Sequence, residues 1–197
     1  MKKRLSKDER RKNIIISAIM VFSKKNFNAA TTAEIAKEAG VSEALIYQHF
    51  KSKKELFLES MDFTGTFFVE NLKELLNQYT NDPVEGFRAV YKFYYNYLKQ
   101  NPTLAKMSLM ITAEADDIDI KEKLKKYLDK SAEILEKSIR NTQKKGLLLK
   151  SANPKILAWT IVGNYQLLSL LKLTDNLNIF DEQSVISLIE PFIPKKK

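Results

Sequence analysis

The chain has 197 residues, of which 44% are hydrophobic, so it is long and apolar enough to bury the core of one or two domains. Its formal net charge of +9 favours an anionic partner, either nucleic acid or an acidic membrane surface. The lack of cysteine excludes disulfides and thiolate metal sites, and no apolar segment follows the basic start of the chain, so we expect no secretory signal and a cytoplasmic location.

The basic excess lies near the start of the chain, where the first helix is also predicted. The first 60 residues hold 13 lysines and arginines against 7 acidic residues, whereas the rest of the chain holds 20 against 17. A helix is predicted over residues 7–24, because Ile14, Ala18 and Phe22 recur every four residues. We expect Asn26 to end this helix in the left-handed conformation.

The next segment, residues 31–57, has the pattern of two short helices joined by a tight turn, with a third helix directly after them. Thr31 and Glu34 form a capping box that starts the first of these helices. Gly40 ends it, because glycine adopts the left-handed conformation at least cost. Ser42 is placed to cap the second helix.

The second helix of this pair, about residues 43–50, is too short to be stable alone in water, so packing must hold it. Ile46 and Phe50 lie four residues apart and can anchor one side. Ser52 and Glu55 form a second capping box that starts the third helix. The pattern is that of a helix-turn-helix motif, whose second helix enters the DNA major groove. The alternative is an ordinary helical corner with no role in DNA binding.

The same segment resembles the DNA-binding region of the TetR family of bacterial transcriptional repressors. The shared features are the paired threonines Thr31 and Thr32, the sequence EIAKEAGVS, the Tyr-x-His-Phe end of the second helix and the Lys-Ser-Lys-x-x-Leu that follows. The resemblance covers roughly the first 60 residues. It implies an N-terminal DNA-binding domain at 1–52 and a C-terminal ligand-binding and dimerisation domain at 53–197, bridged by a long helix that starts near residue 53.

The residues of the motif divide by their chemistry. Hydroxyl and ammonium groups near helix ends suit phosphate oxygens, and family members use the matching positions in this way; here these are Thr31, Thr32, Tyr47, Lys51 and Lys53. Base contacts are expected from Glu43, Ala44, Leu45 and Gln48, with Gln48 suited to an adenine edge and the small apolar groups to a thymine methyl. For Glu43 a solvated acid at the helix start is an equal alternative. Ser42, the cap, and His49, through packing and backbone contacts, complete the predicted DNA-binding set.

Further helices are expected downstream of the motif. The third helix continues to about Tyr79, and three pairs of a capping residue and a proline start later ones. The predicted ranges are 83–100, 102–115, 119–145, which Gly146 ends, 154–173, and a last helix from Asp181 to Glu190. No stretch has the pattern of a strand. The expected fold is therefore all-α, with about nine helices in a small N-terminal bundle and a larger C-terminal one.

Neither a catalytic centre nor a cofactor site is predicted. Because His49 is the only histidine, no Ser-His-Asp triad or multi-histidine metal site can form elsewhere in the chain. The sequence allows a metal site made only of carboxylates at Asp116, Asp117 and Asp119, but a charged, solvated loop is the preferred interpretation. An all-α enzyme is accordingly the least supported class of function.

The C-terminal part is rich in aromatic residues and methionine, including four tyrosines within residues 91–97. The ordinary interpretation is core, yet each buried tyrosine hydroxyl needs a partner. The resemblance implies a ligand pocket, which we expect to be large, mostly apolar and suited to a hydrophobic or amphipathic compound. The candidate lining residues are Phe67, Phe68, Tyr91, Tyr94, Tyr95, Met107, Met110 and Trp159, with Asn164 and Gln166 as polar contacts.

The most apolar stretch, residues 156–173, is interrupted by polar side chains, so we expect a buried helix rather than a membrane span. This helix must pack against other helices on more than one side. These are either helices of the same subunit or, as the resemblance favours, helices of a second subunit in a two-fold homodimer. The predicted function is a homodimeric repressor that binds a palindromic operator and is released by a small molecule. The alternative is a ligand-independent architectural or adaptor protein that binds DNA.

Overall fold

A computed structural model describes residues 6–194, and this part of the chain contains eight α-helices, three short 3-10 helices and no strand. The α-helices are α1 (Lys7–Lys24), α2 (Thr32–Ala39), α3 (Glu43–His49), α4 (Lys53–Gln78), α5 (Pro83–Gln100), α6 (Pro102–Ala113), α7 (Ile118–Lys144) and α8 (Pro154–Leu173). The 3-10 helices are η1 (Leu177–Ile179), η2 (Ser184–Leu188) and η3 (Glu190–Phe192). The all-α prediction is confirmed, while the predicted limits at residues 1 and 197 lie outside the described range.

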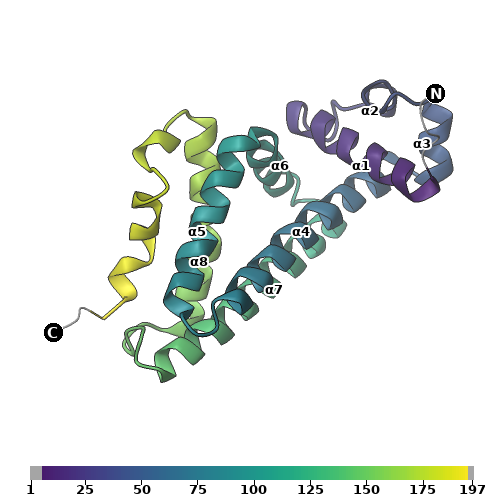
Figure 1. Ribbon diagram of the computed structural model, residues 1–197. Helices are drawn as coiled ribbons and strands as arrows, with labels where there is room; N and C mark the ends of the chain where they lie inside the picture. The colour runs from purple at the N-terminus through teal and green to yellow at the C-terminus, as the bar shows by residue number, and fades with distance from the viewer. Residues whose placement is uncertain (1–5, 195–197) are drawn as a thin grey trace.

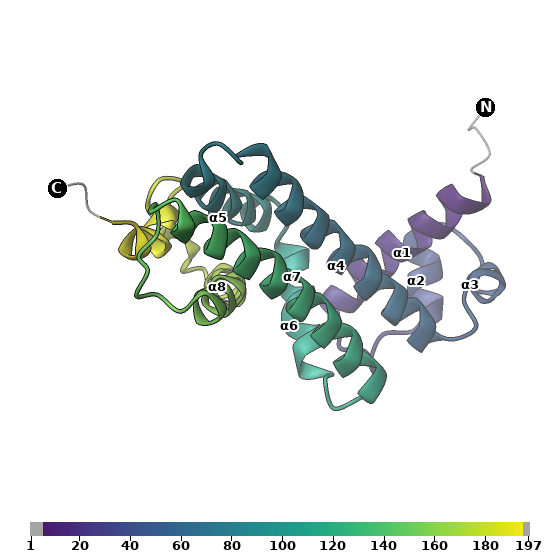
Figure 2. The same cartoon turned by 90° about the horizontal axis from the view of Figure 1, so that it is seen from below.

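The helices form an elongated molecule with a small three-helix unit at one end (Figure 1). Helices α1 to α3 make this unit, and α4 runs from it into the rest of the protein. Both views show α4 lying along α7, with α5, α8 and the C-terminal 3-10 helices farther from the N-terminal unit (Figure 2). Helix α6 packs against both α1 and α8, so it links the two ends of the molecule.

Local capping explains most of the helix bounds. Thr31 and Glu34 form the predicted capping box, and Gly40 is left-handed with φ 65°. The ranges 83–100 and 154–173 are confirmed, because Asp82 and Asn153 cap the helices that Pro83 and Pro154 begin. The helix predicted at 102–115 ends earlier, at Ala113, and the one predicted at 119–145 is shifted by one residue at each end. Gly146 follows it in the left-handed conformation, as expected.

Three capping predictions differ from the structure. Asn26 is not left-handed; its side chain instead accepts a hydrogen bond from the Ala29 amide at 2.7 Å and makes a turn. Asn101 does not cap α6, because its carboxamide donates to the Tyr97 carbonyl. The second capping box is only half formed, since the Glu55 carboxylate accepts from the amide of Lys51 rather than from that of Ser52.

The last predicted helix is wrong, so the described chain has eight α-helices instead of about nine. Residues 181–190 form the 3-10 helix η2 and the start of η3. The Asp181 carboxylate accepts from the amides of Gln183 and Ser184, which makes a tight turn in place of a regular helix start. Val185 and Ile189 are fully buried against the α5–α8 body, so packing outweighs helical propensity here.

The buried side chains form two clusters. One holds the N-terminal unit together around Ile14, Phe22 and Phe57, and it extends to Met107 and to other side chains of α6 and α7. The other lies between α4, α5, α7, α8 and the C-terminal 3-10 helices. The core of the N-terminal unit is therefore built partly from helices of the C-terminal part, which couples the two ends of the molecule by direct packing.

Candidate DNA-binding and ligand-binding sites

The turn between α2 and α3 has the geometry that the sequence predicts. The Gly40 amide donates to the Lys37 carbonyl at 3.2 Å, and the Val41 amide donates to the Ala36 carbonyl at 3.0 Å. Ser42 then caps α3 by accepting from the Leu45 amide at 3.3 Å. This hydrogen bonding fixes the angle at which α3 leaves α2.

Helix α3 is held from one side and open on the other. Ile46 and Phe50 are each only 1% exposed within the N-terminal core. The side chains on the open face are exposed; they are Glu43, Ala44, Tyr47 and Gln48. Helix α3 lies at the outer tip of the molecule in both views (Figures 1 and 2), so its open face is free to meet a large partner such as duplex DNA.

A hydrogen-bonded group joins α2 to this open face. The Thr32 hydroxyl donates to the Glu43 carboxylate and lies 3.1 Å from the Tyr47 hydroxyl. Thr32 itself is buried. Thr32 therefore positions Glu43 and Tyr47. The sequence predicted phosphate contacts for Thr32 and Tyr47, and for Glu43 either a base contact or a solvated acid; these contacts stay predictions.

The Lys53 side chain makes its hydrogen bonds within the protein. Its ammonium donates to the carbonyls of Phe27 at 2.8 Å and Ala30 at 2.9 Å, and lies 4.6 Å from the centre of the Phe27 ring. The side chain thus fastens the α1–α2 connection to the start of α4. The neighbouring Lys51 is exposed. The phosphate contacts predicted for both lysines stay predictions, but the Lys53 ammonium already donates to protein carbonyls, whereas Lys51 is exposed.

We therefore expect Lys53→Met to affect the stability of the protein and Lys51→Met to affect its binding to DNA. Lys53→Met should lower the free energy of unfolding by about 1.5–3 kcal/mol, because a charge-assisted set of hydrogen bonds is lost. Lys51→Met should leave the free energy of unfolding unchanged and weaken DNA binding to all sequences alike. Because one phosphate contact is lost, the slope of log K against log salt concentration should become shallower by about one. Thermal unfolding and DNA titrations over a range of salt concentrations test both; the reverse pattern would contradict these assignments.

Basic side chains of α1 gather at the end of α3, a feature that the sequence interpretation did not use. Burial, together with the charges of Lys7, Arg11 and Arg10, lowers the pKa of His49 below its usual value. His49 is therefore neutral at pH 7, and its Nδ1 is buried without a hydrogen-bond partner among residues 6–194. Arg11 lies 4.5 Å from the centre of the Phe50 ring. Arg11 also pairs with Glu59. The basic run at the start of the sequence thus lies near the C-terminal end of α3.

The acidic segment between α6 and α7 binds lysine rather than forming a free carboxylate cluster. Lys54 lies 2.8 Å from Asp117 and 2.5 Å from Asp119. The hydrogen bond from Lys54 lowers the pKa of Asp117, although partial burial opposes this. Glu114 accepts from the Phe27 amide at 3.3 Å. These contacts join the N-terminal unit to the α6–α7 connection.

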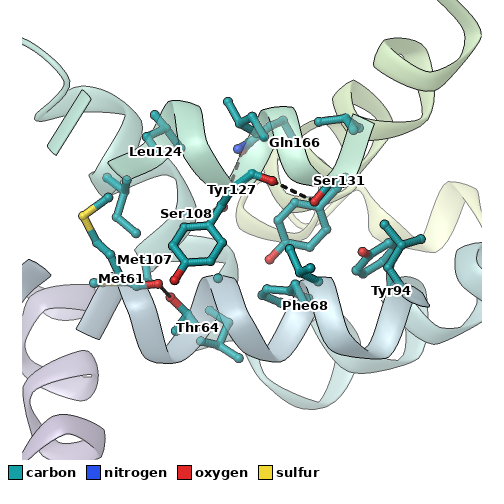
Figure 3. A pocket seen from close by; sticks show the side chains of 18 of the residues that line it. Met61, Thr64, Phe68, Tyr94, Met107, Ser108, Leu124, Tyr127, Ser131 and Gln166 are labelled. Atoms are coloured by element: carbon teal, nitrogen blue, oxygen red, sulfur yellow. Dashed lines mark hydrogen bonds between the residues drawn. The ribbon is translucent and has the colours of Figure 1, made fainter. Parts of the chain in front are cut away.

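A cavity of about 130 Å³ lies between α4, α6, α7 and α8 (Figure 3). Four of the predicted ligand residues line it: Phe68, Tyr94, Met107 and Gln166. Further lining comes from residues that the sequence interpretation did not select, including Met61, Thr64, Ser108, Ile111, Leu124, Tyr127, Leu128, Ser131 and Tyr165. The α7 members recur once in each helical turn, with Tyr127 and Leu128 adjacent. Charged residues are so frequent on this helix that the sequence pattern did not reveal its apolar face.

The other predicted ligand residues lie elsewhere. The hydroxyl of Tyr91 accepts from the Asn164 carboxamide at 2.7 Å, so this pair is a satisfied core contact. The Tyr95 hydroxyl donates to the Phe180 carbonyl at 2.9 Å. The remaining three, Phe67, Met110 and Trp159, do not line the cavity. Tyr91, Asn164 and Tyr95 therefore serve packing between segments of the protein, whereas Trp159 is exposed on α8.

Tyr127 closes the cavity against α4. Its ring lies where a side chain on Gly65 would stand, 2.6 Å from the position of an added Cβ. Its hydroxyl donates to the Asp62 carboxylate at 2.7 Å, and Lys123 pairs with the same carboxylate. Burial opposes ionisation of Asp62, but the hydrogen bonds from Lys123 and Tyr127 outweigh it and lower its pKa.

One face of α8 is apolar and uncovered. Ile156 is 64% exposed and Leu170 is 50% exposed, and Trp159 and Leu167 lie between them on the same helical face. Apart from its chain neighbours and the adjacent backbone of α8, no described atom lies within 4 Å of the place where a side chain on Gly163 would begin. Helix α8 is also the one helix of the described residues that is long and apolar enough to cross a membrane, and 28% of its most apolar window is buried. One such helix is weak evidence for a membrane span, because core helices of soluble proteins pass the same test of length and composition.

Comparison with known proteins identifies the N-terminal unit. Residues 14–60, which span the motif and its supporting helices, match the family described as bacterial regulatory proteins, tetR family. This part of the chain is therefore similar to the DNA-binding region of TetR-family proteins. These proteins are transcription regulators with a helix-turn-helix and a helical C-terminal domain, and the described helices of this chain follow that arrangement.

The chain spans about half the length of the curated relatives that it matches. It is 35% identical over 98 residues to the transcriptional activator FasR of Mycolicibacterium smegmatis, which covers 50% of this chain and 44% of FasR. It is 30% identical over 104 residues to the nucleoid occlusion factor SlmA of Vibrio vulnificus, which covers 52% and 53%.

The fold of the whole chain is found in solved structures. The transcriptional regulator FadR from Bacillus subtilis, in complex with stearoyl-CoA, superposes with a TM-score of 0.78 at 18% identity. The superposition covers 92% of this chain and 97% of FadR. At this identity the likeness shows a shared TetR fold.

Proposed function

We propose that this protein is a dimeric transcriptional regulator that acts in the cytoplasm, binds a palindromic operator through α3 and leaves it when a hydrophobic or amphipathic small molecule occupies the cavity. The observation that carries the proposal is a shared wall. Met61, Met107 and Ile111 line the cavity and also belong to the core of the N-terminal unit. A ligand that moves these side chains therefore acts directly on the unit that presents α3.

The open face of α3 supports operator recognition. Gln48 can make two hydrogen bonds to an adenine edge, and Ala44 can contact a thymine methyl. The exposed Lys51 and the basic residues of α1 beside His49 suit the flanking phosphates.

We expect Gln48→Ala to change which bases are preferred at one operator position, at a cost of about 1–3 kcal/mol for the preferred base. Tyr47→Phe is the matched variant on the same face, and it should weaken binding to all sequences equally through loss of a phosphate contact. Binding to a panel of single-base operator variants measures both. An equal loss at every variant for Gln48→Ala would contradict base reading by this side chain.

The effector step follows from packing and from ion pairs. Helix α6 carries two of the shared side chains and packs on α1, and Lys54 ties the start of α4 to the acidic segment before α7. A ligand that prefers a different spacing of α4, α6 and α7 shifts the population toward a state in which the two α3 helices no longer match successive major grooves. A preference of a few kcal/mol is enough to change operator occupancy substantially.

A second copy of this chain is the proposed cover for the apolar face of α8. A large exposed apolar patch on a helix marks an interaction surface. A two-fold dimer brings the same face of both chains together, with Gly163 allowing close approach, and gives two α3 helices for the two halves of a palindrome. FadR of B. subtilis, which shares the fold, was solved with stearoyl-CoA, so in that protein the fold accommodates a ligand with a long acyl chain.

An adaptor function is the second candidate, and the similarity to SlmA favours it, because that relative is a nucleoid occlusion factor. The two functions differ in their response to small molecules. Selection of bound duplexes from a random pool, with and without candidate effectors, tests them together. A palindromic consensus whose binding is lost with an effector supports the regulator; a consensus that no effector changes supports the adaptor. The relative FasR is named an activator, so the same experiment also shows whether an effector weakens or strengthens binding.

A further inference from the structure

The cavity is lined by apolar and uncharged polar side chains alone. No lysine, arginine, histidine, aspartate or glutamate is among its lining residues in the described chain. A carboxylate or an ammonium group buried there would lose its hydration without gaining an opposite charge, which is strongly unfavourable. The composition of the wall therefore selects against charged ligands.

Most of the polar groups in the wall are already used. The hydroxyls of Thr64, Ser108 and Ser131 donate to backbone carbonyls of their own helices at 2.9–3.0 Å. The Tyr127 hydroxyl donates to Asp62. Figure 3 shows these side chains along the two sides of the cavity. None of them needs a ligand.

Three groups are left over. One is the Tyr94 hydroxyl, which makes no hydrogen bond within residues 6–194. The hydroxyl of Tyr165 is buried without a hydrogen-bond partner of acceptable geometry within residues 6–194, although the hydroxyls of Ser108 and Ser169 lie near it. The Gln166 carboxamide is approached only by Ser108 Oγ, at 3.5 Å from Oε1, among the described residues. A buried hydroxyl without a partner is uncommon and costs stability, so its retention in a cavity wall needs an explanation.

The volume limits the ligand as well. An apolar cavity of about 150 Å³ is enough for one benzene molecule. The cavity of about 130 Å³ found here is of that order, so it accepts a single ring with small substituents.

We propose that the effector is an uncharged, single-ring compound with one hydroxyl or carbonyl group, of the size of an alkylphenol, which pairs with the Tyr165 hydroxyl and the Gln166 carboxamide. This inference rests on the proposed function in one respect, namely that the cavity is the effector site. Burial raises the pKa of the Tyr165 hydroxyl, so the group stays neutral and can donate or accept.

The test compares the affinities of single-ring compounds of similar size that differ in their polar or charged group. We expect p-cresol to bind the full-length protein about three- to tenfold more tightly than toluene, which lacks the hydroxyl, as one neutral hydrogen bond predicts. Benzoate and benzylamine should bind at least about tenfold more weakly than p-cresol at pH 7. Tyr165→Phe should abolish the preference for p-cresol over toluene and raise the thermal stability of the free protein. Tyr79→Phe, on a tyrosine at the end of α4 that does not line the cavity, should change neither.

Isothermal titration and thermal unfolding give these values. Equal or tighter binding of benzoate, binding only of long-chain acyl compounds, no binding of any single-ring compound, or an unchanged preference in Tyr165→Phe would each overturn the proposal. If Tyr165→Phe does not fold, Gln166→Met is measured in the same way. Operator binding is measured in the same samples, so that the proposed function and the proposed class of effector are tested separately. Absence of operator binding would contradict the regulator function. The proposal about the effector depends only on which compounds bind.

Discussion

Leu167→Glu combined with Leu170→Glu is expected to convert the protein into a monomer with almost no operator affinity. Both side chains are exposed on the apolar face of α8. In a two-fold dimer the substitutions place four carboxylates in a dry interface, where their desolvation and mutual repulsion are unfavourable. Loss of the dimer removes the benefit of two linked half-sites, so apparent operator affinity should fall by about 10²–10⁴-fold.

Sedimentation velocity and a DNA titration measure this double variant. Leu147→Glu is its control, because it makes one substitution of the same kind at an exposed leucine outside α8. The control should remain a dimer with unchanged operator affinity. If the double variant is still dimeric, α8 is not the dimer interface. If the unsubstituted protein is monomeric at micromolar concentration, there is no such dimer.

Phe50→Ala is expected to abolish operator binding and to lower the free energy of unfolding by about 3–5 kcal/mol. Phe50 is 1% exposed, follows the last residue of α3 and lies beneath the Arg11 guanidinium. A helix of seven residues does not persist without its anchor, so α3 should lose its fixed direction. The melting temperature should fall by about 2–4 °C for each kcal/mol lost.

Phe87→Ala separates loss of stability from loss of α3. Phe87 is equally buried but belongs to the other core cluster, on α5. We expect a similar decrease in stability for Phe87→Ala, with operator affinity retained at temperatures well below its melting point. Equal loss of operator binding in both variants would mean that global stability, and not the placement of α3, decides DNA binding.

Local sequence patterns predicted the helices of the DNA-binding unit because the signals there are local as well. The capping box at Thr31, the left-handed Gly40 and the cap at Ser42 each need only a few neighbouring residues, and all are present. The same kind of reasoning failed at 181–190. There the burial of Val185 and Ile189 against distant helices decided the backbone, and no local pattern reports such packing.

The direction of individual side chains was harder to predict than the helices that carry them. Lys53 had the chemistry of a phosphate contact, but carbonyls from the α1–α2 connection, more than 20 residues away in the chain, take its ammonium. Tyr91 and Asn164 had the chemistry of a ligand site, but they satisfy each other. Tyr127 was missed because only the pairing of α7 with α4 turns it toward the cavity.

A titration of the purified protein with a palindromic duplex, taken from the random-pool selection, tests the central claim most directly. We predict two chains per duplex, with α3 of each chain protected by the DNA and an affinity that falls steeply as salt increases. Failure of any duplex to bind at low ionic strength, or binding that leaves α3 unprotected from solvent, would contradict this account.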